Sequence, residues 1–381
     1  MKTFISIILL LSLLSCSELK EYIRKHSKHS NTIVSSSIDP SSSENIDAKT
    51  SEMKKEIKTA ADTDQSIKTL PRKKKVFMIK KPILSAKVSK YCNLIDKKFY
   101  LYGWGKSYCK DYQWNHVRSS HLGRPLIWLT YGNEQEHKKI SKNMTMIFCT
   151  VHGDEITPTR FCFDIIEDLN KRIQNPLLKE EFKDLLIVVA PIVNPDSFFK
   201  KYPTRTNFRK VDVNRNFPTK DWKKSAIKLW KKKYRSDRRR FPGFKALSEQ
   251  ETIFQVNLIK RYKPNKIISV HAPLTIIDYD GPHKKRAKNA NQLLIQMSND
   301  ASGYKIKDYP FFTGSLGNWA GNERHIPTYT LELPTSDNRK SKKYWNRFKE
   351  AIRSAVKSDL NKDLNVADGE STEKLNSKKS L

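Results

Sequence analysis

Two short motifs about 120 residues apart hold the side chains of this sequence that are best suited to chemistry. His152 and Glu155 stand three residues apart in His-Gly-Asp-Glu, and His271 ends the later motif Ser-Val-His. Two imidazoles and one carboxylate make a three-ligand zinc set whose fourth position stays open to water, which is typical of catalytic rather than structural sites. The H-x-x-E spacing alone is common by chance, so this prediction of one Zn²⁺ depends on the sequence around the motifs.

The elements around these motifs must bring the three side chains together. Each motif follows an apolar run typical of a buried strand, and strand signals alternate with helical ones along the chain. This alternation predicts an α/β fold with a mixed, largely parallel central sheet and helices on both faces. In open sheets of this kind ligand sites form beyond the carboxyl ends of strands, where both histidines fall. The predicted strands are residues 125–129, 144–151, 185–189, 266–270 and 328–333, and the predicted helices start near 157 or span about 248–262, 285–300 and 340–357.

Further motifs give the chain a family resemblance over about residues 120–357. Asn194-Pro195-Asp196, the run from Val211 to Pro218, and Thr330-Leu331-Glu332-Leu333 accompany the two histidine motifs in the order seen in zinc metallocarboxypeptidases. The sequence therefore resembles that family, and within it the murein peptide amidase branch. That branch cuts the bond between γ-D-glutamate and meso-diaminopimelate in cell-wall peptides. The resemblance to the branch lies in Gly123–Trp128, Pro242-Gly243, Ser248–Thr252, His271–Leu274 and Gly314–Trp319.

The resemblance implies roles for residues near the metal. It makes His152, Glu155 and His271 the zinc ligands, and Glu332 the general base that moves a proton from water to the leaving amine. A carboxylate beside a metal-bound water is suited to that task, because zinc lowers the pKa of the water to about 7. Taken singly, Glu155 could instead cap a helix and Glu332 could be a surface charge on an edge strand.

The resemblance also implies how the substrate is held. Arg205 fits the cation that stabilises the oxyanion, with Arg209 as the alternative. Asn214 and Arg215 are expected to bind the free α-carboxylate of the released residue, since a guanidinium fork matches a carboxylate. Asp212 is expected to accept a hydrogen bond from His152 and orient it.

Two acidic residues just after the second histidine motif extend this hypothesis. Asp278 and Asp280 could meet the distal amino group of diaminopimelate, or they could be ordinary loop carboxylates.

Three functions are consistent with these residues. The leading hypothesis is a zinc-dependent hydrolase of the γ-D-glutamyl–meso-diaminopimelate bond in murein peptides. A general metallocarboxypeptidase acting on the C-termini of proteins or peptides is the second. The third is a non-enzymatic wall-binding lipoprotein built on the same fold.

The start of the chain predicts export. An apolar run from Phe4 to Leu14 follows Lys2, and it is too short to span a bilayer but suits a signal peptide over residues 1–15. The small residue before Cys16 resembles a bacterial lipobox, which would leave Cys16 lipidated and the protein anchored to a membrane. An ordinary secretory signal is the alternative. Ser17 favours the outer membrane, so we expect a periplasm-facing lipoprotein of the bacterial cell envelope.

Composition divides the rest of the chain. Residues 16–70 are rich in Ser, Lys, Glu and Asp and bury too little apolar surface to fold, so they predict a disordered tether. We expect an approach segment at 71–118, a single catalytic domain at 119–360 and a disordered tail at 361–381. The aromatic-rich stretch at 100–114 should pack on the domain or shape the substrate entrance.

The chain is strongly basic, with 73 Lys and Arg against 40 acidic residues and a formal charge of +33. Clusters such as 72–75 and 238–240 look like nucleic-acid patches, but an exported protein does not meet nucleic acid. We therefore expect no nucleic-acid partner, and a basic surface that attracts anionic wall polymer or lipid headgroups.

Four cysteines follow Cys16. Cys92 and Cys109 are the candidate disulfide, because exported proteins meet oxidising conditions. Cys149 and Cys162 fall on a core strand and on an apolar helix face, where the expectation is two small buried hydrophobes.

Overall fold

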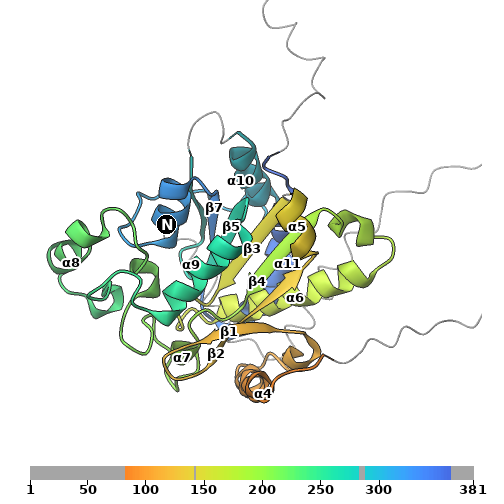
Figure 1. Cartoon of the computed structure of the whole chain (residues 1–381), viewed down its shortest axis with the longest axis horizontal. Helices are drawn as coiled ribbons and strands as arrows, with labels where there is room; N and C mark the ends of the chain where they lie inside the picture. Colours follow the sequence, from red (N-terminus) through yellow and green to blue (C-terminus); the bar gives the residue numbers. More distant parts are fainter. Residues whose placement is uncertain (1–81, 141–142, 283–287, 362–381) are drawn as a thin grey trace, which may run out of the picture. The chain divides into compact units, whose positions relative to one another are not determined.

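The computed structural model describes residues 82–140, 143–282 and 288–361 (Figure 1). The predicted signal peptide, Cys16 and the tether lie outside these residues, as does the tail after residue 361. Among the described helices, none is both long and apolar enough to cross a membrane.

A seven-stranded mixed sheet forms the centre of the domain. Its spatial order is β1-β2-β4-β3-β5-β7-β6. The four strands from β4 to β7 in this order run parallel, and the pairs β1–β2, β2–β4 and β7–β6 are antiparallel. The predicted mixed sheet is therefore confirmed, with its parallel strands at the centre. The strands are β1 (Asn115–Ser119), β2 (Pro125–Tyr131), β3 (Asn143–Cys149), β4 (Leu185–Ala190), β5 (Lys266–His271), β6 (Ile276–Asp280) and β7 (Thr328–Glu332).

Helices cover both faces of this sheet (Figure 1). Apolar residues of α4, α6, α10 and α11 share one core with one face of the sheet, and those of α9 share a second core with the other face. The predicted arrangement of helices on both faces is thus confirmed. The helices are α4 (Ala86–Leu101), α5 (Glu134–Ile140), α6 (Thr157–Gln174), α7 (Pro195–Phe198), α8 (Trp222–Lys232), α9 (Gln250–Tyr262), α10 (Lys288–Asp300) and α11 (Ser341–Lys357).

The central strands are apolar on both sides because both of their faces are covered. In β3, Ile147 belongs to the core beneath α6 and α11, whereas Met146 and Phe148 belong to the core beneath α9. Successive side chains of a strand point to opposite faces, so an uninterrupted apolar run fills both cores. This is why uninterrupted apolar runs mark these strands in the sequence.

The segment before the predicted domain is more ordered than its sequence indicates. No helix was predicted within the approach segment, but residues 86–101 form α4. Cys92 and Cys109 form the predicted disulfide, and Phe99 of α4 packs edge-on against Phe163 of α6. The described part of the approach segment therefore belongs to the core.

The expectation for the other two cysteines is wrong. Cys149 at the end of β3 and Cys162 in α6 are joined by a disulfide. Both side chains are fully buried, as predicted, but the strand and helix patterns did not indicate that the two positions face each other. The bridge closes the stretch of chain that contains His152 and Glu155.

Candidate metal centre and active site

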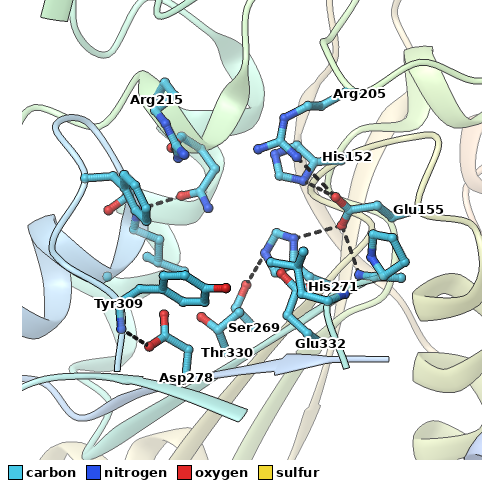
Figure 2. Close-up of a pocket in the computed structure, with 18 of the residues that line it drawn as sticks. His152, Glu155, Arg205, Arg215, Ser269, His271, Asp278, Tyr309, Thr330 and Glu332 are labelled. Atoms are coloured by element: carbon cyan, nitrogen blue, oxygen red, sulfur yellow. Dashed lines mark hydrogen bonds and ion pairs between the residues drawn. The ribbon is translucent and has the colours of Figure 1, made fainter. Parts of the chain in front are cut away.

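The three predicted zinc ligands come together at the carboxyl edge of the parallel strands. His152 and Glu155 lie in the connection between β3 and α6, and His271 is the last residue of β5, the neighbour of β3. All three side chains are buried, and their ligand atoms lie within 4.8 Å of one another (Figure 2). Two segments about 120 residues apart thus converge on one point.

The Glu155 carboxylate lies between the two imidazoles. His152 Nδ1 is 2.7 Å from Glu155 Oε1, and His271 Nδ1 is 2.8 Å from Glu155 Oε2. The backbone amide of Ala272 also donates to Oε2 at 3.3 Å. Both Nδ1 atoms therefore face the same carboxylate.

The outer nitrogen of each imidazole has its own partner. His152 Nε2 lies 3.1 Å from Asp212 Oδ1, and His271 Nε2 lies 2.9 Å from Ser269 Oγ. Metal-ligating histidines usually have such a partner, which fixes the ring orientation and tautomer. Asp212 had been predicted for this position. Ser269 had not, although residues two apart on a strand share a face and Ser269 precedes His271 by two.

The electrostatics of this cluster favour an ionised carboxylate. Burial opposes the charge on Glu155, but the two imidazoles outweigh burial and lower its pKa. Burial likewise opposes the charge on Asp212, and the neighbouring Arg205 and His152 lower its pKa. Two buried imidazoles and one buried carboxylate are the donor set that Zn²⁺ prefers, so these residues fit a zinc ion.

The structure separates the two candidate arginines. Arg205 donates from Nε to Asp212 Oδ2 at 3.0 Å and from a terminal nitrogen to Glu155 Oε1 at 3.3 Å, and it lines the pocket. Arg209 pairs instead with Glu249 at 3.8 Å, and 53% of its side chain is exposed. The geometry favours Arg205 as the cation beside the ligands.

Glu332 lies next to His271. It is the last residue of β7 and pairs in register with His271 on β5, and its Oε2 accepts from the backbone amide of Leu274 at 3.3 Å. Burial raises the pKa of Glu332 to about 7, with Glu155 adding to the rise and His271 opposing it. A carboxyl group with such a pKa is suited to exchange protons near neutral pH.

Arg215 lies on the other side of the same pocket (Figure 2), which Asn214 also lines. Arg215 stacks on Phe312 with 4.8 Å between guanidinium and ring centroid, and within the described chain its buried Nε has no hydrogen-bond partner. Asn214 accepts through Oδ1 from the backbone amide of Leu316 at 2.7 Å, which fixes its side chain. Both residues can therefore present donors to an anionic group in the pocket.

Gly314 sets the position of Arg215. It has φ of +75°, and a Cβ there would lie 2.1 Å from the Arg215 carbonyl oxygen. That carbonyl also accepts from Trp222 Nε1 at 2.9 Å. Only glycine permits this close approach.

Two carboxyl groups complete the pocket wall. Asp278 and Asp280 lie two residues apart on β6 and both line the pocket, and Asp278 accepts from the Tyr309 amide at 3.0 Å. Burial raises the pKa of Asp278 to about 6 and that of Asp280 to about 8. A Cβ on Gly317 would lie 1.8 Å from Asp280 Oδ2, so the lack of a side chain at Gly317, the first residue of the π-helical turn Gly317–Asn322, makes room for Asp280.

The pocket has a volume of about 620 Å³, which is enough for a peptide fragment. Tyr309 and Phe312 line it without having been predicted, because no motif or periodicity marks the loop in which they lie. The predicted ligands, Glu332, Arg205, Asn214 and Arg215 all line it as well.

Comparisons with known proteins agree with this geometry. The chain matches the zinc carboxypeptidase family over residues 106–357. Murein peptide amidase A of Vibrio campbellii is 30% identical over 216 residues, which is 56% of this chain and 76% of that protein. Murein peptide amidase A of Escherichia coli K12 is 28% identical over 232 residues, which is 60% of this chain and 85% of that protein. The solved structure of carboxypeptidase A from Helicoverpa armigera shares the fold, with a TM-score of 0.54 and 16% identity over 83% of this chain and 81% of that one.

A mixed sheet with a histidine–glutamate–histidine set at its carboxyl edge defines a metallohydrolase. More specifically, this chain belongs to the zinc carboxypeptidase family and is a zinc metallopeptidase. The family resemblance seen in the sequence and the predicted enzyme class are confirmed.

Proposed function

We propose that this chain hydrolyses the γ-D-glutamyl–meso-diaminopimelate bond of murein peptides. One observation carries the proposal: two carboxyl groups and a half-buried arginine, whose buried Nε has no hydrogen-bond partner among the described residues, line the same pocket as the predicted zinc ligands. Diaminopimelate has two carboxylates and a distal amine, so it can use both kinds of partner. The relatives named murein peptide amidase A support this choice of substrate.

The proposed chemistry uses the ligand set and its neighbours. His152, Glu155 and His271 would hold Zn²⁺, which would supply the Lewis-acid chemistry for activating water and polarising the scissile carbonyl. Glu332 accepts the proton of the attacking water and then delivers it to the leaving amine. Arg205 provides positive charge beside the carbonyl oxygen as that oxygen gains negative charge.

The remaining residues position the substrate. Arg215 and Asn214 hold the α-carboxylate of the released residue, and the stacking on Phe312 fixes the plane of the guanidinium. Asp278 and Asp280 face the distal amine. Asp212 and Ser269 orient the two imidazoles without touching the substrate.

The general carboxypeptidase is the alternative, because Arg215 would bind any free C-terminal carboxylate. The zinc-loaded full chain should be assayed on L-Ala-γ-D-Glu-meso-diaminopimelate and on ordinary peptides of equal length. We expect cleavage of the former, loss of activity with a chelator, and recovery with about one equivalent of zinc. Cleavage of ordinary peptides alone would contradict the proposed substrate.

We also propose that the chain acts in the cell envelope, anchored through Cys16. The apolar run before Cys16 supports this, and the two disulfides agree with an oxidising compartment. Metabolic labelling with a fatty-acid probe should mark the wild type and leave Cys16→Ala unlabelled. Equal labelling of both would contradict the anchor.

A further inference from the structure

One surface segment is far more basic than the chain average. Residues 220–240, which we call the basic arm, include α8 and contain 11 Lys and Arg against two Asp. The whole chain has 73 Lys and Arg in 381 residues, about one in five, whereas the arm has about one in two. A general excess of lysine does not account for this concentration.

The cations of the arm point to solvent. All 11 are exposed, and within the described part of the chain salt bridges engage two of them. Arg239 pairs with Asp154 at 2.8 Å, and Arg240 pairs with Asp237 at 3.6 Å. The other cations have no such partner among the described residues.

The fold does not need this charge. The arm is attached through its apolar side chains: Trp222 and Ala226 are buried, and Trp230 packs on Phe241 and donates to the Asp237 carbonyl oxygen. Like charges three or four residues apart on α8, such as Lys224 and Lys228, weaken a helix. The lysines therefore cost stability, which an external partner could offset.

The arm is continuous with the active site. Arg239, Arg240 and Asp237 line the same pocket as the zinc set and Glu332. Arg239 is tied to Asp154, the neighbour of the ligand Glu155. In Figure 1, α8 lies to the left of the sheet, and the chain leads from α8 to the pocket-lining Arg239 and Arg240.

We propose that the basic arm is a docking surface for the carboxylate-rich polymer that carries the scissile peptide, the cell wall itself. This inference rests on the proposed function for the identity of the polymer. A polymer with many regularly attached peptides offers many carboxylates, so several weak and salt-screened contacts act together. Docking would then raise the local concentration of scissile bonds at the pocket.

The arm fits a polymer better than a bilayer. A helix that lies in a membrane interface presents an apolar face outward. The apolar residues Trp222 and Ala226 of α8 instead face the domain, and its exposed face is charged. Binding by charge alone suits an extended polyanion.

The test compares two full-chain variants with equal loss of charge. The arm variant carries Lys224→Gln, Lys228→Gln, Lys231→Gln and Lys232→Gln. The control carries Lys179→Gln, Lys260→Gln, Lys342→Gln and Lys343→Gln, all exposed sites outside the arm. Glutamine has nearly the helix propensity of lysine, so both should fold, and the pair Lys231→Gln with Lys232→Gln serves if the fourfold variant does not.

Cosedimentation with purified, insoluble murein sacculi measures docking at several salt concentrations. We expect the arm variant to bind about tenfold or more weakly than the wild type, the control within about twofold, and the difference to vanish at high salt. The kcat/KM on the soluble tripeptide should change by less than about twofold in both variants. Equal weakening in both variants would overturn the proposal, because binding would then depend on the total positive charge of the surface and not on the arm.

Two further results separate this proposal from its alternatives. Arm-dependent binding to anionic phospholipid vesicles, with unchanged binding to sacculi, would overturn it in favour of a membrane partner. Arm-dependent binding to sacculi by a protein that fails to cut the tripeptide would support docking and refute the proposed bond specificity. The docking proposal is therefore tested by binding to sacculi, and the proposed bond specificity is tested separately by cleavage of the tripeptide.

Discussion

At the scale of single residues, Glu332 has a role that substitution can isolate. Glu332→Gln keeps the shape of the side chain but removes the proton acceptor. We expect kcat to fall about 10²–10⁴-fold, the usual contribution of a general base, with little change in KM. Steady-state kinetics and zinc content should be measured together, because unchanged zinc content shows that the ligand set is intact. Turnover equal to that of the wild type would contradict the role of Glu332.

Asp278 should set the preference for a distal amine. Asp278→Asn keeps the acceptor for the Tyr309 amide but removes the negative charge. We expect KM for the diaminopimelate peptide to rise about tenfold, equivalent to about 1.4 kcal/mol, and KM for a peptide without a distal amine to stay the same.

The same residue gives this preference a pH dependence. Burial raises the pKa of Asp278 to about 6, so its carboxyl group gains charge, and affinity for an amine, as the pH rises through that value. The wild type should show this change in KM and Asp278→Asn should lack it. An equal rise of KM for both peptides in the variant would indicate a structural effect instead.

The sequence predicted those pocket residues that belong to short motifs and missed those that only folding brings to the pocket. His152, Glu155 and Glu332 stand in recognisable strings after apolar strands. Tyr309 and Phe312 reach the pocket from a loop with no pattern, and only the folded chain shows that they do.

At the scale of elements, the disulfide between β3 and α6 closes the segment that carries two of the predicted metal ligands. Replacing both Cys149 and Cys162 by Ala should lower the free energy of unfolding by about 3 kcal/mol, because a short closed loop restricts the unfolded chain. Denaturant unfolding of oxidised wild type and double variant measures the difference. Reduced wild type serves as a second comparison, and equal stability of all three samples would contradict the prediction.

The central strands and the helices α9, α10 and α11 were predicted, whereas the edge strands β1 and β6 and the helix α8 were not. The parallel strands carry long apolar runs because both faces are buried. The edge strand β6 has the sequence Ile-Ile-Asp-Tyr-Asp, in which two carboxyl groups break the apolar pattern. In α8 the apolar positions were hidden by the many lysines between them.

At the scale of the whole molecule, a buried lysine makes the free energy of unfolding depend on pH. This lysine is the first residue of β5, at the opposite end of the strand from His271. Lys266 is fully buried and donates to Asn143 Oδ1 and to the Ser358 carbonyl oxygen, each at 2.6 Å. Burial lowers its pKa to about 7, far below its ordinary value. Above that pH the folded chain has released a proton that the unfolded chain still binds, so this lysine makes stability rise with pH.

The substitution Lys266→Met should remove this contribution to the pH dependence of stability. The free energy of unfolding of the wild type minus that of the variant should rise by about 2 kcal/mol from about pH 7.5 to about pH 9.5. The prediction concerns this rise and not the size of the difference at either pH. Denaturant unfolding of both proteins at each pH gives the comparison. A difference that does not depend on pH would mean that Lys266 keeps its proton in the folded state.

The Cys149–Cys162 bridge has a consequence for biogenesis. A nascent chain in a reducing cytosol lacks this bond, so the stretch that supplies His152 and Glu155 is held there by weaker interactions alone. Under the export proposed above, oxidation would secure the pocket residues only after secretion, which would spare the producing cell an active hydrolase before its destination is reached.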